Sequence, residues 1–367
     1  MSNKIFVDVN VIQTVPPSCV NRDDTGSPKT AVYGGIPRAR VSSQSWKKAM
    51  RDYFRNDFDE SELGYRTKKV VDLIAARISE KDGSVSAEDA AKKAADVLTA
   101  AGVTLKAPKK KKGEEEQPAT ETGALFFISR KQIDNMASLA LEGGYDKKAA
   151  QAALMAGHGI DVALFGRMVA DDPSLNVDAS SQVAHGISTH RVDNEYDYYT
   201  AVDDMSPKDN AGAGMIGTVE FNSSTLYRYA TVAVHDLADH LGSSDAAAKA
   251  AAEFVKAFVL SMPTGKQNTF ANRTAPYAVF IAVRADQPVS LVTAFETPAR
   301  CGDGGYNEDS ARKMVQEEEK VCSEFVIPPV KSWQIGDGLE KLGPQSSLAD
   351  SVAQLEDYLK SALGKEE

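Results

Sequence analysis

The stretch Val20–Arg55, VNRDDTGSPKTAVYGGIPRARVSSQSWKKAMRDYFR, passes from a polar loop through the turn Gly34-Gly35 into an amphipathic segment. Apolar residues in that segment recur at i, i+3, i+4, i+7 and i+8, which is the spacing of one helical face. They are Trp46, Ala49, Met50, Tyr53 and Phe54. We therefore expect a helix at about 43–56 that turns this face toward the core.

The start of this helix has the chemistry of an anion site. Ser42 and Ser43 stand in the N-cap region, where unpaired backbone N–H groups and the positive end of the helix dipole favour a phosphate. Arg38, Arg40 and Lys47 surround that end. The pattern predicts an anchor for a nucleic-acid backbone, and it equally fits a basic helix face that is only solvated.

Charge is unevenly distributed along the chain. The 367 residues carry a net charge of −10, yet residues 1–56 hold nine Lys and Arg against four Asp and Glu. Residues 286–367 hold eight against sixteen. Local fields guide an anionic ligand more than the total charge does, so the acidic total does not exclude RNA.

The composition indicates a soluble protein of a reducing compartment. The three cysteines show no metal-type spacing and no disulfide framework. The N-terminal residues lack the pattern of a signal peptide, and no apolar stretch is long enough to span a bilayer. We expect a cytoplasmic protein without a membrane partner.

The first strand precedes this stretch. Ile5, Val7, Val9 and Val11 alternate with other residues, which predicts a strand with one buried face that ends at Pro16-Pro17. An alanine-rich region at 57–180 then predicts a helical insertion.

Capping residues mark two helices of this insertion. Ser86 and Ser129 are expected N-caps, and Gly143-Gly144 is an expected helix end. Residues 106–123 are low complexity, with a lysine run beside a glutamate run. They predict an exposed, disordered loop more than a basic binding site.

From about Val183 onward, the sequence again shows the two-residue periodicity that predicts strands. A polar, aromatic and glycine-bearing excursion at 193–218 interrupts these strands. A helix to about Ser261 and the strand PYAVFIAVR follow.

Without the insertions, the order of the expected elements is strand, helix, strand, strand, helix, strand. This predicts an α+β fold with a ferredoxin-like (RRM-like) βαββαβ core. The aromatic signature of an RNA-recognition motif is missing, so loops and insertions are expected to contact RNA. Two helices are expected after residue 300.

The sequence offers no converging catalytic set. His185 with His190 and His235 with His240 are spaced five apart, which suits neither one strand face nor a helical zinc pair. His158 has no partner nearby. The carboxylate pairs are expected to be solvated or to cap helices; they are Asp23-Asp24, Asp171-Asp172 and Asp203-Asp204. We therefore expect a binding protein without metal or cofactor.

Several long segments, in order, resemble one family. They are SCVNRDDTG, AVYGGIPRARVSSQSWKKAMR, GIDVALFGRM, SQVAHGISTHRVDNEYDYYTAVDD, GTVEFNSSTLYRYA and PTGKQNTFA. Together they are similar to CasC, the repeated backbone subunit of the type I-E CRISPR surveillance complex Cascade. The resemblance covers about residues 1–300. It departs from the family at 106–123 and is weak in the last portion.

The resemblance implies a right-hand shape. The ferredoxin-like palm would comprise 1–56 and 181–300, the helical fingers 57–180, and a β-hairpin-like thumb 193–218, with a helical extension at 301–367. Copies would stack along a guide RNA and kink it, so that it pairs with target DNA in short runs. The other Cascade subunits, CasA, CasB, CasD and CasE, would be partners. The family's subunit is non-catalytic.

Carried onto this sequence, the resemblance also implies guide-RNA contacts in four places. The palm would supply Arg22, Lys29, Arg38, Arg40, Ser42, Ser43, Gln44, Lys47 and Arg51, the fingers side Arg167 and Met168, the thumb Tyr198, Tyr199 and Thr200, and the loop before the last palm strand Lys266 and Gln267. Hairpin packing is the alternative role for the two tyrosines.

Two other functions remain open from the residues. Related backbone subunits of other CRISPR types cut RNA with a loop aspartate, which makes Asp23 or Asp24 the candidate for a metal-dependent ribonuclease. The basic face could also meet an acidic protein in a purely structural scaffold.

Overall fold

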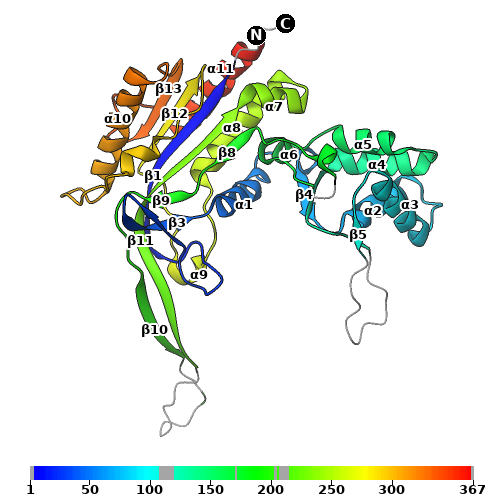
Figure 1. Ribbon diagram of the computed structural model, residues 1–367, viewed down its shortest axis with the longest axis horizontal. Helices are drawn as coiled ribbons and strands as arrows, with labels where there is room; N and C mark the ends of the chain where they lie inside the picture. The colour runs from blue at the N-terminus through cyan, green and yellow to red at the C-terminus, as the bar shows by residue number, and fades with distance from the viewer. Residues whose placement is uncertain (1–3, 107–119, 170–171, 202–204, 206–214, 365–367) are drawn as a thin grey trace. The chain divides into compact units, whose positions relative to one another are not determined.

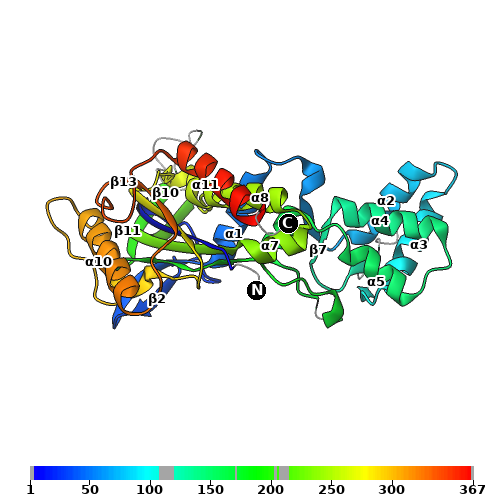
Figure 2. The same cartoon turned by 90° about the horizontal axis from the view of Figure 1, so that it is seen from above.

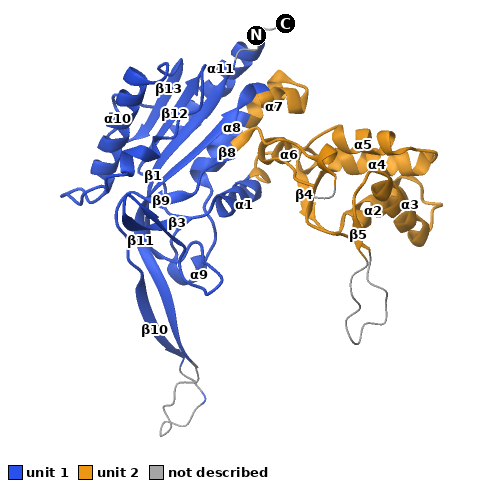
Figure 3. Ribbon diagram, viewed as in Figure 1, with its two compact units in different colours: residues 1–53, 182–235, 251–365 blue, residues 54–181, 236–250, 366–367 orange. Residues whose placement is uncertain are grey.

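The computed structural model describes residues 4–106, 120–169, 172–201, 205 and 215–364 (Figure 1). Most of the low-complexity segment 106–123 and the far part of the excursion 193–218 lie outside these ranges. The chain divides into two compact units (Figure 3). Unit 1 comprises Met1–Tyr53, Gln182–His235 and Ala251–Lys365, and unit 2 comprises Phe54–Ser181, Asp236–Ala250 and Glu366–Glu367.

A mixed α+β architecture is observed, as the sequence predicted. The described strands of the main sheet follow the order β13-β12-β1-β11-β9-β3-β2, with β10 and β8 also paired to β11. Their bounds are β1 Phe6–Ser18, β2 Thr30–Tyr33, β3 Ile36–Val41, β8 Ser181–Val183, β9 Gly186–Ser188, β10 Glu195–Ala201, β11 Met215–Ala233, β12 Ala278–Arg284 and β13 Lys331–Gly336. β1 is antiparallel to both β11 and β12.

Helices cover both faces of this sheet (Figure 2). On one face, the Arg228 guanidinium of β11 lies 3.8 Å from the ring centroid of Trp46 in α1 and 4.6 Å from that of Phe258 in α8. The neighbouring Tyr227 points to the opposite face, because side chains alternate along a strand. There it packs in a cluster with residues of η3 and α10 such as Phe295 and Met314. The sheet is therefore the middle layer of unit 1.

The helices that lie wholly or partly in unit 1 have the following bounds: α1 Ser43–Phe54, α7 Val234–Leu241, α8 Ser244–Leu260, α9 Gln267–Phe270, η3 Leu291–Phe295, α10 Asn307–Glu324 and α11 Leu348–Leu363. The end of α1 and parts of α7 and α8 belong to unit 2. The predicted helix at about 43–56 is thus confirmed as α1. No helix in the described part of the chain is long and apolar enough to cross a membrane.

Strand β1 is buried on both faces, whereas the sequence predicted one buried face. Val9 is fully buried on one side, and Asp8 and Asn10 are fully buried on the other. The strand also continues through Pro16-Pro17 to Ser18. Its pairing with β11 shifts register between Val15 and Ser18, which accommodates the prolines.

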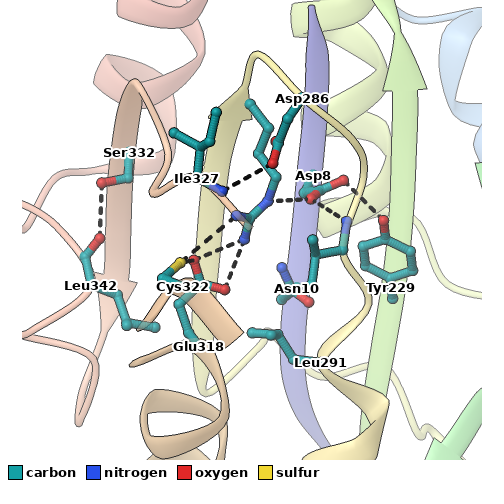
Figure 4. Close-up of polar contacts among 12 residues, drawn as sticks. Asp8, Asn10, Tyr229, Asp286, Leu291, Glu318, Cys322, Ile327, Ser332 and Leu342 are labelled. Atoms are coloured by element: carbon teal, nitrogen blue, oxygen red, sulfur yellow. Dashed lines mark hydrogen bonds and ion pairs between the residues drawn. The ribbon is translucent and has the colours of Figure 1, made fainter. Parts of the chain in front are cut away.

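A buried ion network explains how Asp8 is tolerated there (Figure 4). Arg284 Nε donates to Asp8 Oδ2 at 2.8 Å, and Arg284 Nη2 lies 2.7 Å from Glu318 Oε2 of α10. Tyr229 Oη donates to Asp8 Oδ1 at 2.9 Å, and the backbone N–H of Val289 donates to Oδ2. The network satisfies the buried charges and joins α10 to the sheet.

The last portion of the chain contains a strand that the sequence did not predict. Strand β13 pairs with β12 and buries Trp333, so the region after residue 300 extends the sheet as well as adding the two expected helices. Helix α11 buries Val352, Leu355 and Leu359, which share one apolar face.

Unit 2 is mainly helical. Its elements are η1 Glu60–Glu62, β4 Gly64–Thr67, α2 Val70–Lys81, α3 Ala87–Ala100, β5 Leu105–Lys106, β6 Glu121–Thr122, β7 Phe126–Ser129, α4 Arg130–Glu142, α5 Lys147–Met155, α6 Ile160–Phe165 and η2 Pro173–Leu175. The predicted caps are confirmed: Ser86 Oγ accepts from the N–H of Asp89, and Ser129 Oγ accepts from that of Gln132. Gly143 ends α4 with a φ of 68°.

Candidate nucleic-acid interface

A hollow of about 570 Å³ lies in unit 1 beside the start of α1. Three segments line it: residues 20–26, one side of α1 from Ser45 to Asp52, and residues 263–265. Asn21 ties the first segment to the residue before α1, because its Oδ1 accepts the backbone N–H of Ser42 at 2.9 Å. The polar loop is thereby held against the residue that precedes the helix.

The segment 263–265 approaches the loop so closely that only glycine fits. A Cβ on Gly265 would lie 2.1 Å from the carbonyl oxygen of Val20. The next residue, Lys266, has a φ of 52°, in the left-handed region that is uncommon for residues other than glycine. Such a conformation costs on the order of 1 kcal/mol and persists only when its surroundings impose it. The chain is thus constrained where it presents Lys266.

The segments that carry Arg22 and Lys266 meet beside Cys19, because a Cβ on Gly265 would lie 2.9 Å from the Cys19 carbonyl oxygen. Burial raises the pKa of the Cys19 thiol, and the positive charges of Arg22 and Lys266 oppose that shift. The Arg22 side chain is exposed, and so is that of Gln267 at the start of α9. Of these predicted contact residues, Arg22 lines the hollow, and Lys266 and Gln267 directly follow Gly265, which lines it as well.

A second basic cluster comprises Lys29, Arg40 and His185. Arg40 Nη1 lies 3.2 Å from His185 Nδ1, and Arg40 Nε donates to the carbonyl oxygen of Thr30 at 3.0 Å. Burial lowers the pKa of His185, and Arg40 and Lys29 lower it further. The spacing of His185 in the sequence raised only the question of a metal ligand and did not predict this contact. Its place in this cluster depends on the pairing of β3 with β9, which joins Arg40 to Ile187 across the sheet.

Helix α1 presents the remaining predicted palm residues. Gln44 is exposed, Ser43, Lys47 and Arg51 are half-buried, and Ser42 is buried just before the helix. Burial lowers the pKa of Lys47.

The opposite face of α1 is the core face that its spacing predicted, with Trp46, Met50 and Phe54 fully buried. Lys48, which was not predicted as a contact, lines the hollow and forms an ion pair of 2.5 Å with Asp52. The i,i+4 spacing of Lys48 and Asp52 is the sequence feature from which this ion pair could have been predicted.

The buried position of Arg38 does not agree with the phosphate contact expected for it. Its side chain is 0% exposed, and its three guanidinium nitrogens donate to the carbonyl oxygens of Tyr33, Ser188 and Phe295 at 3.1, 3.0 and 2.8 Å. Burial lowers its pKa. Arg38 therefore holds the turn before β3 to β9 and η3, and no donor faces solvent to meet a phosphate.

Arg167 in unit 2 is likewise internal, in contrast to the expected RNA contact. It is 3% exposed, donates from Nε to the carbonyl oxygen of Leu175 at 3.0 Å, and lies over the Phe126 ring. Burial lowers its pKa to about 10. The next residue, Met168, is 84% exposed, so only Met168 of this pair is accessible.

The predicted thumb is a two-stranded ribbon of β10 with the first part of β11, and it extends from one end of the sheet (Figure 1). Tyr198 faces Thr218 across the ribbon, and Tyr199 faces Gly217. The side chains of Tyr198 and Tyr199 are 64% and 37% exposed, and Thr200 is exposed as well.

The carboxylate pairs have local roles where the structure describes them. Asp23 Oδ1 accepts the backbone N–H groups of Thr25 and Ser27, each at 3.0 Å, and the Thr25 hydroxyl at 2.7 Å. The Thr25 hydroxyl is the main cause that lowers the pKa of Asp23. Asp24 is exposed beside it in the hollow. Asp172 caps η2, and Asp171, Asp203 and Asp204 lie outside the described residues.

The arrangement is suited to hold an anionic chain by charge. Arg22, Lys29, Arg40 and Lys266 are near the surface of unit 1 around the polar loop. Among the residues that the structure describes, no three His, Cys, Asp or Glu side chains come together as a metal site.

Comparison with known proteins identifies the family of this chain. The family model described as CT1975-like protein matches residues 7–361. A chain of a solved structure described as "CRISPR RNA-guided surveillance complex, pre-nicking" is 33% identical with a TM-score of 0.83, over 97% of this chain and 100% of that one. A chain of a "CRISPR RNA-guided surveillance complex" is 30% identical with a TM-score of 0.70, over 95% and 99%. No curated protein sequence matches. With nearly its whole length matched by the family model, the chain belongs to the CT1975-like protein family.

Proposed function

We propose that this protein binds CRISPR guide RNA as a subunit of a Cascade-type surveillance complex. The observation that carries the proposal is that cations lie on two sides of the polar loop. Arg22 lines the hollow beside α1, which is also lined by Gly265, the residue before Lys266, and Lys29 and Arg40 line a smaller hollow with Asn21. Cations that meet phosphates supply affinity without reading sequence. The two solved complexes to which the chain is similar support RNA as the ligand.

In finer detail, we propose the role of CasC, the repeated backbone subunit of the type I-E complex. The strand order β12-β1-β11-β9, with α1 and α8 in the connections, supports a ferredoxin-like palm. Unit 2 would then be the fingers and the β10–β11 ribbon the thumb. Copies of the chain would form a filament along the guide in the cytoplasm, together with CasA, CasB, CasD and CasE. The guide, kinked at each copy, would pair with target DNA.

We also propose that the subunit is non-catalytic. The alternative, a metal-dependent ribonuclease, would use Asp23 or Asp24. Asp23 has less support for that role, because its Oδ1 already accepts three hydrogen bonds that form the turn at residues 23–27.

Mass spectrometry of the intact complex, co-expressed with a CRISPR array, tests the assignment. We expect several copies of this chain for each retained guide RNA. Fluorescence anisotropy of the purified protein with two unrelated single-stranded RNAs of equal length should give equal affinities. A complex with one copy would refute the backbone role, and a complex free of RNA or a strong preference between the two RNAs would refute sequence-independent guide binding.

A further inference from the structure

The start of α10 contacts the sheet where β11 changes partner. Strand β11 pairs with β10 up to Phe221 and with β1 from Asn222 onward. This junction is the base of the ribbon, and the register shift in β1 lies beside it. Any group that fixes the junction therefore fixes the direction in which the ribbon leaves the sheet.

His190 is the central residue of this junction. It is buried five residues before β10, and its Nε2 accepts the backbone N–H of Thr225 at 3.1 Å. Its Nδ1 lies 2.8 Å from the carbonyl oxygen of Arg191, to which it donates. A ring that accepts at one nitrogen and donates at the other is the neutral imidazole. The ring thus connects Arg191, in the segment that leads into β10, with Thr225, which lies in β11 four residues beyond its ribbon part.

Tyr306 holds that ring from the α10 side. The rings of His190 and Tyr306 are stacked, with centroids 3.6 Å apart and an interplanar angle of 7°. Tyr306 precedes α10 directly, and its ring is half-buried. A stacked aromatic partner restricts the rotation of an imidazole that its two hydrogen bonds alone would leave free to tilt.

Two further residues of α10 bind the same junction. Asn307 Oδ1 accepts the hydroxyl of Thr14 at 2.6 Å and lies 3.4 Å from the hydroxyl of Thr225. Ser310 Oγ lies 2.9 Å from Thr189 Oγ1. The start of α10 therefore contacts β1, β11 and the segment that leads into β10. Farther along the helix, the Glu318–Arg284–Asp8 network joins α10 to the sheet a second time.

We infer that Tyr306, Asn307 and Ser310 are positioning residues for the ribbon, so that the portion after residue 300 sets the direction in which Tyr198 and Tyr199 are presented to RNA. This inference rests on the proposed function. It gives the last portion a role that neither its acidic charge nor its helical spacing indicates, because the role depends on contacts with residues 82 or more positions earlier.

The test compares Tyr306→Ala with Tyr306→Phe, which keeps the ring. Phe325→Ala is the matched control, since it removes an exposed aromatic ring just after the other end of the same helix. Hydrogen exchange of the full-length protein without RNA reports the ribbon amides of 195–201 and the amide of Thr225. We expect Tyr306→Ala to accelerate exchange there roughly three- to tenfold, and Tyr306→Phe and Phe325→Ala to leave it unchanged.

Affinity for a labelled single-stranded RNA is the second readout. Tyr306→Ala should weaken it roughly three- to tenfold, with rescue by Tyr306→Phe. If Tyr306→Ala does not fold, Asn307→Ala serves the same test, because it removes the shared acceptor and keeps the stack. Unchanged exchange in the ribbon, or unchanged affinity where Tyr199→Ala weakens binding, would overturn the inference. Absence of RNA binding by the wild-type protein would instead refute the proposed function, while the exchange experiment still decides whether α10 orders the ribbon.

Discussion

The ring of Tyr199 covers Gly217 on the neighbouring strand of the ribbon. A Cβ built on Gly217 would lie only 2.5 Å from both Cζ and Oη of Tyr199. The glycine therefore provides the space in which the ring rests, and Tyr198 on the opposite face is the more exposed of the two tyrosines. The two tyrosines that look equivalent in the sequence consequently differ: one packs across the ribbon and the other faces outward.

Gly217→Ala should displace the Tyr199 ring without unfolding the ribbon. We expect RNA affinity to fall by about as much as in Tyr199→Ala, within the roughly 1–3 kcal/mol that one base stack contributes. Fluorescence anisotropy with single-stranded RNA measures both. Gly83→Ala is the matched control, because a Cβ there meets no atom within 4 Å and no left-handed φ is involved. Equal loss in both glycine variants would contradict the role of the Tyr199 ring.

Arg22→Ala and Lys266→Ala should weaken binding to all RNA sequences alike. Each variant removes one phosphate contact, so the slope of log K against log salt should become shallower by about 0.7 on single strands. Arg38→Ala is the contrasting variant. Because it leaves three buried carbonyl groups without a donor, it should lower the free energy of unfolding by roughly 2–5 kcal/mol. A change of slope in Arg38→Ala at unchanged stability would return Arg38 to the RNA contacts.

Incubation of the purified complex with complementary RNA and Mg²⁺ should leave that RNA intact. Asp23 stabilises a turn, and among the residues that the structure describes no three His, Cys, Asp or Glu side chains come together as a metal site. Gel electrophoresis of end-labelled RNA measures cleavage. Regularly spaced fragments that disappear with Asp24→Ala would establish the ribonuclease alternative.

Arg284→Met should strongly destabilise unit 1. Removing the cation leaves the carboxylates of Asp8 and Glu318 buried without a cationic partner, which typically costs about 3–5 kcal/mol. Urea denaturation measures the change. Arg312→Met on α10, the helix that carries Glu318, is the control, because Arg312 pairs with Asp309 while 54% of its side chain is exposed. That substitution should change stability by less than about 1 kcal/mol.

The stability of unit 2 should fall between about pH 6.5 and pH 4. Burial, with Arg167 and His240 nearby, lowers the pKa of His158 from 6.5 to about 4, and Gln132 donates to its Nδ1 at 2.9 Å. The unfolded chain binds the proton below pH 6.5 and the folded chain only below about 4. His158 thus favours folding above pH 6.5, and up to about 3 kcal/mol is lost as the pH falls through this window.

Chemical denaturation at several pH values, compared with His158→Asn, measures that contribution. The variant should show a slope of stability against pH that is shallower by at most about 1.4 kcal/mol per pH unit within the window. Identical slopes for the two proteins would show that His158 does not titrate in this way.

The sequence by itself determined the local elements. Helix α1 and its apolar face follow from the spacing of Trp46, Met50 and Phe54, and the N-caps follow from Ser86 and Ser129. These features depend on residues within a few positions of one another, so periodicity and capping rules are sufficient to predict them.

Only the tertiary structure decided which polar residues are available to a ligand. Arg22 and Arg38 lie within one basic stretch, yet one is exposed and the other donates to three carbonyl groups from distant segments. Likewise, Asp8 is buried because Arg284 and Glu318 meet it from β12 and α10, and β13 becomes a strand because β12 offers a free edge. Burial is set by segments far apart in the chain, and a pattern of neighbouring residues carries no information about which distant groups will cover it.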